Sequence, residues 1–517
     1  MRPSWVVAIT TVLVVSASAL RGAPGADDFF GGGREPLGQP LFQEPAATWE
    51  QPLIHGSTVG PVPGNPAHTE MQEEAAGGVE SRQGAAPGSA EERPRLNAFW
   101  DHGAVLESSD KAFRFHLGGR FDFDNTWYQT TESLPFELQD GAAFRRARLR
   151  ADGTMCETID FMAEVNFAKI HEVPNASTKT EIGRVGLTQF YVTFKELPLV
   201  QNLRVGHFWP PISLEGFSGA NVYHYYMERS PGYEAFLNYF HYVTGVLLFG
   251  SYLDDRATAA ASLTRIGRQT VNPFGFGAGA GEYAATGRLT GLPIWDDEGR
   301  RLVHLGIAYS CNAADDHSFS AANRPLVRAG AGPQQVPNIV QTGTFYTPDP
   351  LQIVNAELAA VYGRFSMSAE YQLARGTRLF QHFDGARYSG PRGNVTYQGV
   401  YVEGGLFLDP RDHRRYDRKM GIWDRLQSEE SQHFLDRHTP VELLCRYSYL
   451  DLVSGSPVLT SASGAPAGRE NDLTAGVSWF INPQLCFTVN YVYTHLAYVN
   501  DTSGDIHGLA CRLHLDF

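Results

Sequence analysis

The chain has 517 residues, of which 43% are hydrophobic and 19% charged, and its formal net charge is −14. This acidic balance argues against a general nucleic-acid-binding protein, because such proteins carry surplus Lys and Arg to neutralise phosphates. The five cysteines are scattered and form no CxxC pair, which excludes a dense disulfide framework and a recognisable zinc cluster. We therefore predict no metal and no cofactor.

Residues 1–22 have the pattern of a secretory signal. Arg2 precedes the apolar stretch WVVAITTVLVV (Trp5–Val15), and the small residues SASA (Ser16–Ala19) follow it. The apolar stretch is too short to span a bilayer comfortably, and the alternative interpretation is a buried N-terminal helix. We expect the protein to be exported.

Residues 23–95 are rich in Pro, Gly, Ala and Glu, as in GSTVGPVPGNPAHTEMQEEAAGG. Such a composition cannot bury enough apolar surface to offset the entropy of ordering, so we predict a disordered periplasmic segment. It would serve either as a tether or simply as a spacer.

From residue 96 onward the polarity of the chain alternates with a period of two. FRFHLGGRFDFD (Phe113–Asp124), IDFMAEVNF (Ile159–Phe167) and RFSMSAEYQL (Arg364–Leu373) each place apolar residues on one face and polar residues on the other. About sixteen such stretches recur, and short turns between them alternate with longer connections. This pattern predicts an all-β fold: a closed antiparallel transmembrane β-barrel of about sixteen strands over residues 96–517. A soluble β-sandwich or β-helix rarely combines such loop asymmetry with an even strand count.

The strand FRRARLRADG (Phe144–Gly153) is rich in arginine. Period two places Arg146, Arg148 and Arg150 on one face. An arginine that faces lipid near the bilayer midplane costs roughly 2–4 kcal/mol, so these three are expected to face the lumen. Arg145 breaks the pattern and is expected near a rim.

Lumenal arginines suggest the chemistry of the solute. Guanidinium groups form bidentate bonds with phosphate-like oxyanions, and a row of moderate sites would let an anion enter and leave. The alternative is an arginine row balanced by acidic residues across the lumen, which would organise water without selecting phosphate. Four further arginines are expected to line the pore: Arg114, Arg120, Arg204 and Arg446.

The chain ends on an alternating strand, GLACRLHLDF (Gly508–Phe517). We expect this strand to close the barrel against the first one. A terminal aromatic residue on such a strand resembles the signal that the barrel-assembly machinery of the outer membrane reads, so that machinery is a predicted partner through Phe517.

Several segments, in the same order, resemble the phosphate-selective porins O and P. FRRARLRADG is similar to the family's arginine-rich second strand. LRVGHFWPPISLE (Leu203–Glu215), followed by YMERS (Tyr226–Ser230), resembles its VGQFK-P-SLE…MERS element. The chain departs from that element at His207-Phe208-Trp209, where the family motif has Gln-Phe-Lys, so a basic residue is missing. Further matches are FLDPRDHRRYDRKMGIWDR (Phe407–Arg425), ELLCRYSYLDL (Glu442–Leu452), LTAGVSWFINP (Leu473–Pro483) and the ending CRLHLDF.

The resemblance implies a homotrimer of sixteen-stranded barrels in the outer-membrane lipid, each with one channel. It also implies that the third extracellular loop folds inward and constricts the pore. By strand order this loop is residues 210–241, and it offers phenols and charged groups. The alternative is a loop packed against the wall, with its charges satisfied there. The residues expected at the constriction are Glu215, Tyr225, Glu228 and Arg229.

Residues 409–440 fit the strand pattern poorly. By strand order they form a turn on the periplasmic side, yet the segment is long and heavily charged. Either the strand count is off by one at this point, or the turn is a real periplasmic element that folds into the mouth. The family resemblance favours the second interpretation.

The predicted function is passive diffusion of small hydrophilic solutes, including anions such as phosphate or polyphosphate, through an arginine-lined channel. The channel would lie in the outer membrane of a Gram-negative-type cell. No GxSxG or HExxH motif is present, and we predict no enzymatic activity and no nucleic-acid partner. His116 and His207 are expected in the lumen or girdle. The alternative is a structural or surface-interaction barrel without an open pore, which would give no conductance.

Overall fold

The computed structural model describes residues 94–168, 185–218, 226–237, 242–265, 283–313, 318–329, 336–384, 387–426, 438–453, 455–456 and 465–517. All of them belong to one compact unit, Ser89–Phe517. The predicted signal (1–22) and nearly all of the predicted disordered segment (23–95) lie outside the described residues. No helix in the described ranges is long and apolar enough to cross a membrane.

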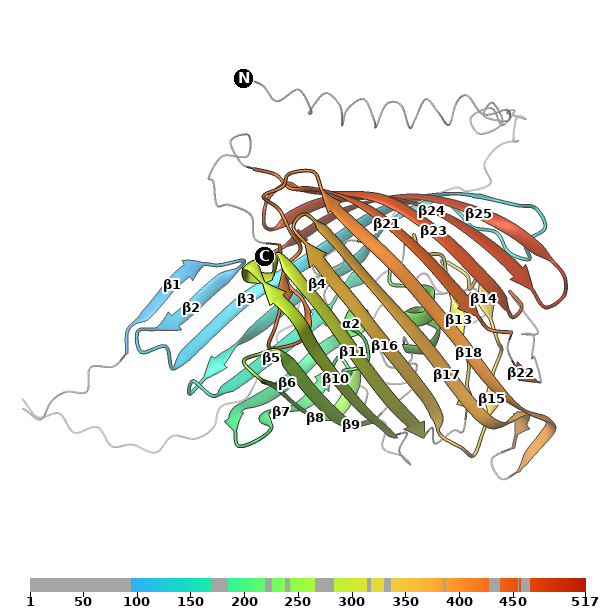
Figure 1. Ribbon diagram of the computed structural model, residues 1–517, viewed down its shortest axis with the longest axis horizontal. Coiled ribbons are helices and arrows are strands. Elements are labelled where there is room, and N and C mark those ends of the chain that lie inside the picture. The colour runs from blue at the N-terminus through green and yellow to red at the C-terminus, as the bar shows by residue number, and fades with distance from the viewer. Residues whose placement is uncertain are drawn as a thin grey trace, which may run out of the picture. The chain divides into compact units, whose positions relative to one another are not determined.

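Sixteen antiparallel strands form a closed barrel, as the alternating pattern predicts (Figure 1). Each strand pairs with the next one in the chain, and short turns join them at one end. The strands are β3 (Phe113–Thr130), β4 (Gly141–Met155), β5 (Ile159–Asn166), β6 (Gly186–Leu197), β7 (Gln201–Phe208), β8 (Val243–Tyr252), β9 (Ala257–Arg265), β10 (Tyr283–Asp296), β11 (Arg301–Ala313), β16 (Leu351–Tyr362), β17 (Phe365–Phe383), β18 (Tyr388–Phe407), β21 (Val441–Asp451), β23 (Gly468–Phe480), β24 (Leu485–Tyr498) and β25 (Ser503–Asp516).

The last strand closes the barrel against the first. β25 pairs with β3 from Ile506 opposite Thr130 to Asp516 opposite Arg120. Phe517 extends the ladder, because its backbone N–H donates to the Gly119 carbonyl at 2.9 Å and its carbonyl accepts from the Gly119 N–H at 2.6 Å. The prediction that the C-terminal strand closes the barrel is confirmed.

The two faces of the barrel differ in polarity. On β11, Leu305, Ile307 and Tyr309 point outward and are 51%, 55% and 46% exposed, whereas His304 and Ser310 are buried inside. The same alternation runs around the barrel and leaves a belt of exposed Leu, Val, Phe and Tyr side chains. Such a belt is stable against lipid and costly in water, which explains why the sequence alternates.

A short hairpin that the sequence analysis missed precedes the barrel. β1 (Leu96–Trp100) pairs with β2 (Ala104–Ser108), and β2 pairs in turn with the first residues of β3, from Ala104 opposite Leu117 to Glu107 opposite Arg114. The free edge of β3 is therefore shared, with β2 on its first part and β25 on the rest.

Three connections pack against the inner wall. We name residues 209–242 the constriction loop, residues 314–350 the second lumenal loop and residues 408–440 the lumenal turn. Their short elements are α2 (Leu214–Phe217) and η4 (Tyr233–Leu237) in the first, β12 (Ser318–Phe319), β13 (Ala322–Asn323), β14 (Val340–Gln341) and β15 (Phe345–Tyr346) in the second, and β19 (Tyr416–Asp417) and β20 (Ile422–Trp423) in the third. Elsewhere, η6 (Asp297–Gly299) forms a tight turn and β22 (Gly455–Ser456) pairs with β18.

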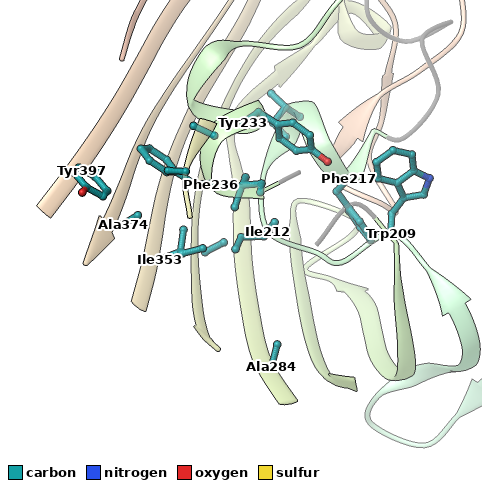
Figure 2. Packing of buried hydrophobic residues seen from close by; sticks show 14 of the residues in the cluster. Trp209, Ile212, Phe217, Tyr233, Phe236, Ala284, Ile353, Ala374 and Tyr397 are labelled. Carbon is teal, nitrogen blue, oxygen red and sulfur yellow. The ribbon is translucent and has the colours of Figure 1, made fainter. Parts of the chain in front are cut away.

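Apolar side chains hold the constriction loop in place. Phe217, Tyr233 and Phe236 of this loop belong to one buried cluster with Ile353 and Tyr397 of the inner wall (Figure 2). Phe236 is fully buried. Because closely packed apolar side chains leave little room for rearrangement, this cluster fixes the loop against strands β10 to β18.

The other two connections are held by polar contacts as well. In the second lumenal loop, the Val327 carbonyl accepts from the Tyr128 hydroxyl at 2.5 Å, and the Ile339 carbonyl accepts from Tyr498 at 2.7 Å. In the lumenal turn, the Gly421 carbonyl accepts from Arg288 of β10 at 2.8 Å. The barrel has sixteen strands with residues 409–440 as a turn, and the structure therefore favours the second interpretation of this segment.

Candidate functional site

The arginine-rich strand β4 directs its charges into the barrel, where acidic residues face them. Arg146 Nη1 lies 2.7 Å from Asp122 on β3, and Arg148 Nη1 lies 2.9 Å from Glu164 on β5. All four residues are buried. Arg150 pairs with Asp152 of its own strand at 2.8 Å. The row is therefore balanced by acidic residues, as the alternative interpretation had it, but by residues on β4 and its two neighbouring strands and not by residues across the lumen.

Arg145 also points inward, because a bulge interrupts the alternation. The register of β3 and β4 shifts between Asp122 and Phe123, which leaves Arg145 as the extra residue of β4. Its guanidinium forms two hydrogen bonds with Glu228 of the constriction loop, at 2.8 and 3.1 Å. A bulge can re-aim one side chain without changing the rest of a strand, which explains how Arg145 breaks the pattern.

Glu228 connects the constriction loop to three other segments. Its carboxylate lies 2.8 Å from Arg145, 2.7 Å from Arg328 of the second lumenal loop and 3.4 Å from Arg512 of β25. Burial would by itself raise the pKa of Glu228, but Arg145 and Arg328 hold this pKa well below its ordinary range. The carboxylate is therefore charged at neutral pH and anchors the loop.

Glu215 lies at the other end of the same loop and is fully enclosed. Its carboxylate accepts hydrogen bonds from the backbone N–H and the hydroxyl of Ser230, at 2.9 and 2.7 Å. Arg446 of β21 approaches it at 3.7 Å and also donates to the Glu228 carbonyl at 3.1 Å. Burial raises the pKa of Glu215 to about 7, although Arg446 opposes this shift. Arg446 thus supports the loop.

Arg229 stacks on aromatic rings of its own loop. Its guanidinium lies 4.7 Å from the centre of the Trp209 ring and 4.8 Å from that of Tyr233. Together with Glu215 and Glu228, these contacts match the alternative interpretation, a loop packed against the wall with its charges satisfied. Tyr225, the remaining residue expected at the constriction, lies outside the described residues.

A cavity of about 210 Å³ remains between the wall and the inward segments. Strands β3 to β7 form one side, and the constriction loop and the lumenal turn form the other. The cavity is lined by the side chains of five arginines and of only two acidic residues: Arg120, Arg148, Arg150, Arg204, Arg425, Glu164 and Asp516.

Two of these arginines form no ion pair in the described part of the chain, although the charges of Glu164 and Asp122 also act on Arg120. Arg120 is 7% exposed, and its Nε has no hydrogen-bond partner. Arg204 donates only to the Thr193 hydroxyl, at 3.1 Å, and stacks 4.0 Å from the centre of the Tyr191 ring. By contrast, Glu164 pairs with Arg148, and Asp516 pairs with Arg425. The charge that remains open to the cavity is positive.

Comparison with known families decides what kind of protein this is. The model of the phosphate-selective porin O and P family matches residues 115–517. The chain belongs to this family. It is therefore an outer-membrane porin, and the resemblance drawn from its sequence is confirmed.

The porin is similar to another porin in sequence and to several solved structures in fold. Porin O of Pseudomonas aeruginosa is 23% identical over 425 residues, which cover 78% of this chain and 88% of that protein. The outer membrane channel DcaP of Acinetobacter baumannii is 12% identical, with a TM-score of 0.46 over 80% of this chain and 99% of that one. The anion-selective porin from Comamonas acidovorans is 10% identical, with a TM-score of 0.41 over 78% of this chain and 99% of that one. At these scores neither structure bears on what this porin transports.

The arginines predicted from the porin's sequence occupy three different places. Arg120, Arg148, Arg150 and Arg204 line the cavity. Arg146 and Arg446 are buried in contacts with Asp122 and with the constriction loop. Arg114 lies beside the N-terminal hairpin, where it pairs with Asp101 at 2.8 Å and its side chain is 41% exposed.

Histidines 116 and 207 both lie on the inner side of the porin. His116 lies 2.9 Å from Asp152, and His207 lies 2.8 Å from the Thr244 hydroxyl.

Sequence reasoning missed three of the arginines that lie inside the barrel. Arg512 stands on the polar face of the last strand beside His514 and Asp516, so period two was sufficient to place it in the lumen. Arg425 belongs to the lumenal turn and Arg328 to the second lumenal loop. No local pattern reveals these two, because loop residues reach the lumen only through tertiary contacts.

Proposed function

We propose that this porin passes small hydrophilic solutes by passive diffusion and favours anions, with phosphate and polyphosphate among them, through an arginine-lined channel. The observation that supports this is the cavity wall, with five arginine side chains against two acidic ones. Arg148, Arg150 and Arg425 are already paired with Glu164, Asp152 and Asp516. An entering anion would therefore meet Arg120 and Arg204, which form no ion pair among the described residues.

The placement of the cavity arginines favours transport of an anion over its tight binding. Arg120 and Arg204 approach the cavity from different strands and share no acidic partner within the described ranges. Two such sites would bind an oxyanion by charge-assisted hydrogen bonds, which are shorter and stronger than neutral ones. An anion shared between neighbouring moderate sites can still leave, as conduction requires.

The test is selectivity in planar bilayers. The zero-current potential in a KCl gradient should indicate preference for chloride, and phosphate should reduce the chloride current. Arg120→Gln should lower the anion preference without loss of folding, since it removes a buried charge that forms no ion pair among the described residues. Arg301→Gln is the matched control: Arg301 lies at a short turn, with its side chain 56% exposed, and should leave selectivity unchanged. A cation-selective wild type, or equal effects of the two variants, would contradict the proposal.

A barrel without an open pore is the second candidate function. The observation in its favour is that three separate segments occupy the lumen and pack closely against the wall. Such a protein would act through its surface loops. The same bilayer experiment separates the two candidates, because the occluded barrel would insert without measurable conductance.

We also propose the organisation around the barrel that the sequence pattern favours. Residues 1–22 would be a cleaved signal and residues 23–95 a disordered periplasmic segment, as their composition supports. The homotrimer rests on the family resemblance, and recognition by the barrel-assembly machinery rests on the aromatic end of β25. Mass spectrometry of the mature N-terminus and native electrophoresis of wild type and Phe517→Ala test these points.

A further inference from the structure

The cavity has a second wall of a different chemistry. Opposite the arginines of β3, β4 and β7 lie Trp209 and Phe217 of the constriction loop and Met420 of the lumenal turn. Met162 of β5 and Tyr191 of β6 add apolar surface on the arginine side. A fully hydrated inorganic ion gains no binding free energy from contact with such an apolar surface. An aromatic and thioether wall next to cationic groups is instead typical of sites for organic molecules that carry one charged end.

Trp209 is held in place. Its ring packs 4.5 Å from that of Tyr242, centre to centre, and the Arg229 guanidinium lies 4.7 Å from its centre. Only 6% of the residue is exposed. Because the ring cannot turn away without breaking both contacts, the surface that it offers to the cavity is preformed, and preformed surfaces bind at lower entropic cost.

Trp209 is also the position at which this chain departs from the family motif. An aromatic ring stands where the motif has a lysine. The Trp209 ring gives the cavity a large apolar surface on the side of the constriction loop. The four arginines on β3, β4 and β7 still supply the positive charge on the opposite side.

We propose that the cavity prefers organic anions, and aromatic carboxylates in particular, over inorganic phosphate. The carboxylate would bind Arg120 and Arg204, and the ring would lie against Trp209 and Phe217. This inference rests on the proposed anion channel and narrows its substrate class. Stacking of one aromatic ring on another adds enough binding free energy to change affinity roughly fivefold.

The experiment compares anions as blockers of chloride current in planar bilayers. The probes are benzoate, acetate and phosphate, with benzyl alcohol as the uncharged aromatic control. Benzoate should reduce the current by half at a concentration roughly fivefold below that of acetate. Benzyl alcohol should have little effect, because it offers no charge to the arginines. Equal blocking by benzoate and acetate in the wild type, or stronger blocking by phosphate than by benzoate, would overturn the proposal, and these comparisons require no variant to fold.

Variants of Trp209 test whether the preference for benzoate arises in this cavity. Trp209→Leu should abolish the difference between benzoate and acetate, and Trp209→Phe should retain most of it. The matched control is Trp127→Leu, because Trp127 lies on β3 and is 42% exposed on the outer face. An unchanged benzoate preference in Trp209→Leu would overturn the assignment to this cavity. A channel that no anion blocks and that is not anion-selective would refute the proposed function, and the inference with it.

Discussion

The carboxylate of Glu228 offers the sharpest test of how the constriction loop is held. Glu228→Gln keeps the shape of the side chain and removes its charge. Breaking one buried ion pair costs about 3–5 kcal/mol, because the remaining charge is left without a partner. Because three arginines surround Glu228, the free energy lost on removing its charge would be several times larger if all three were left without a partner.

The structure argues for the smaller value. Arg512 retains two bonds to Asp124, at 2.6 and 2.7 Å, and Arg328 retains Glu234 at 3.0 Å. Only Arg145 has no other acidic partner among the described residues, and its side chain is 15% exposed. We therefore expect a loss of about 3 kcal/mol, the low end for a single buried pair.

The assay is equilibrium unfolding in phospholipid vesicles, with proteolysis of the constriction loop as a second readout. Asp296→Asn is the matched control, because it breaks an exposed pair with Arg301 and should cost no more than about 1 kcal/mol. The variant Glu228→Gln should unfold more easily than the control and should be cleaved faster within residues 209–242. Equal stability of the two variants, with equal cleavage, would refute the view that this carboxylate anchors the loop.

Two further predictions concern the other inward contacts. Gly421 has a φ of +66°, and an added Cβ would meet the hydroxyls of Thr290 and Thr258 at 2.8 and 2.9 Å. Gly421→Ala should therefore displace the lumenal turn and raise the conductance. The control is Gly363→Ala, because Gly363 has a φ of +57° and open space around it. This control should lose only about 1 kcal/mol of stability, the cost of placing alanine at a positive φ. The pKa of Glu215 is raised from 4.5 to about 7, so the folded state binds the extra proton and stability should fall as the pH rises between these values. The free energy of unfolding, plotted against pH over this range, should have a smaller slope for Glu215→Gln than for the wild type. An unchanged slope would contradict the raised pKa of Glu215.

The alternating pattern predicted the barrel well, because a period of two reports directly which residues face lipid. It also brought Arg120, Arg148, Arg150 and Arg204 to the lumen, and the structure places all four along one cavity. The pattern failed at Arg145, since a bulge is set by the pairing of two strands and not by either strand alone.

The contents of the lumen were less accessible from the sequence. The second lumenal loop and Arg328 within it carry no periodic signal, and their position depends on contacts with strands far away in the chain, such as the bond from Tyr498 to Ile339. The β1–β2 hairpin was missed because its strands have only five residues each. Five residues are too few to establish an alternation between polar and apolar side chains.

The hairpin has a consequence for how the barrel closes. The seam between β25 and β3 joins residues that are far apart in the chain, such as His514 and Asp122, which are separated by 392 positions. A slip by one residue would turn every side chain of β25 to the wrong face. Because β2 already covers β3 as far as Leu117, the incoming strand can pair only from Gly119 onward. The hairpin therefore limits how far the seam extends along β3.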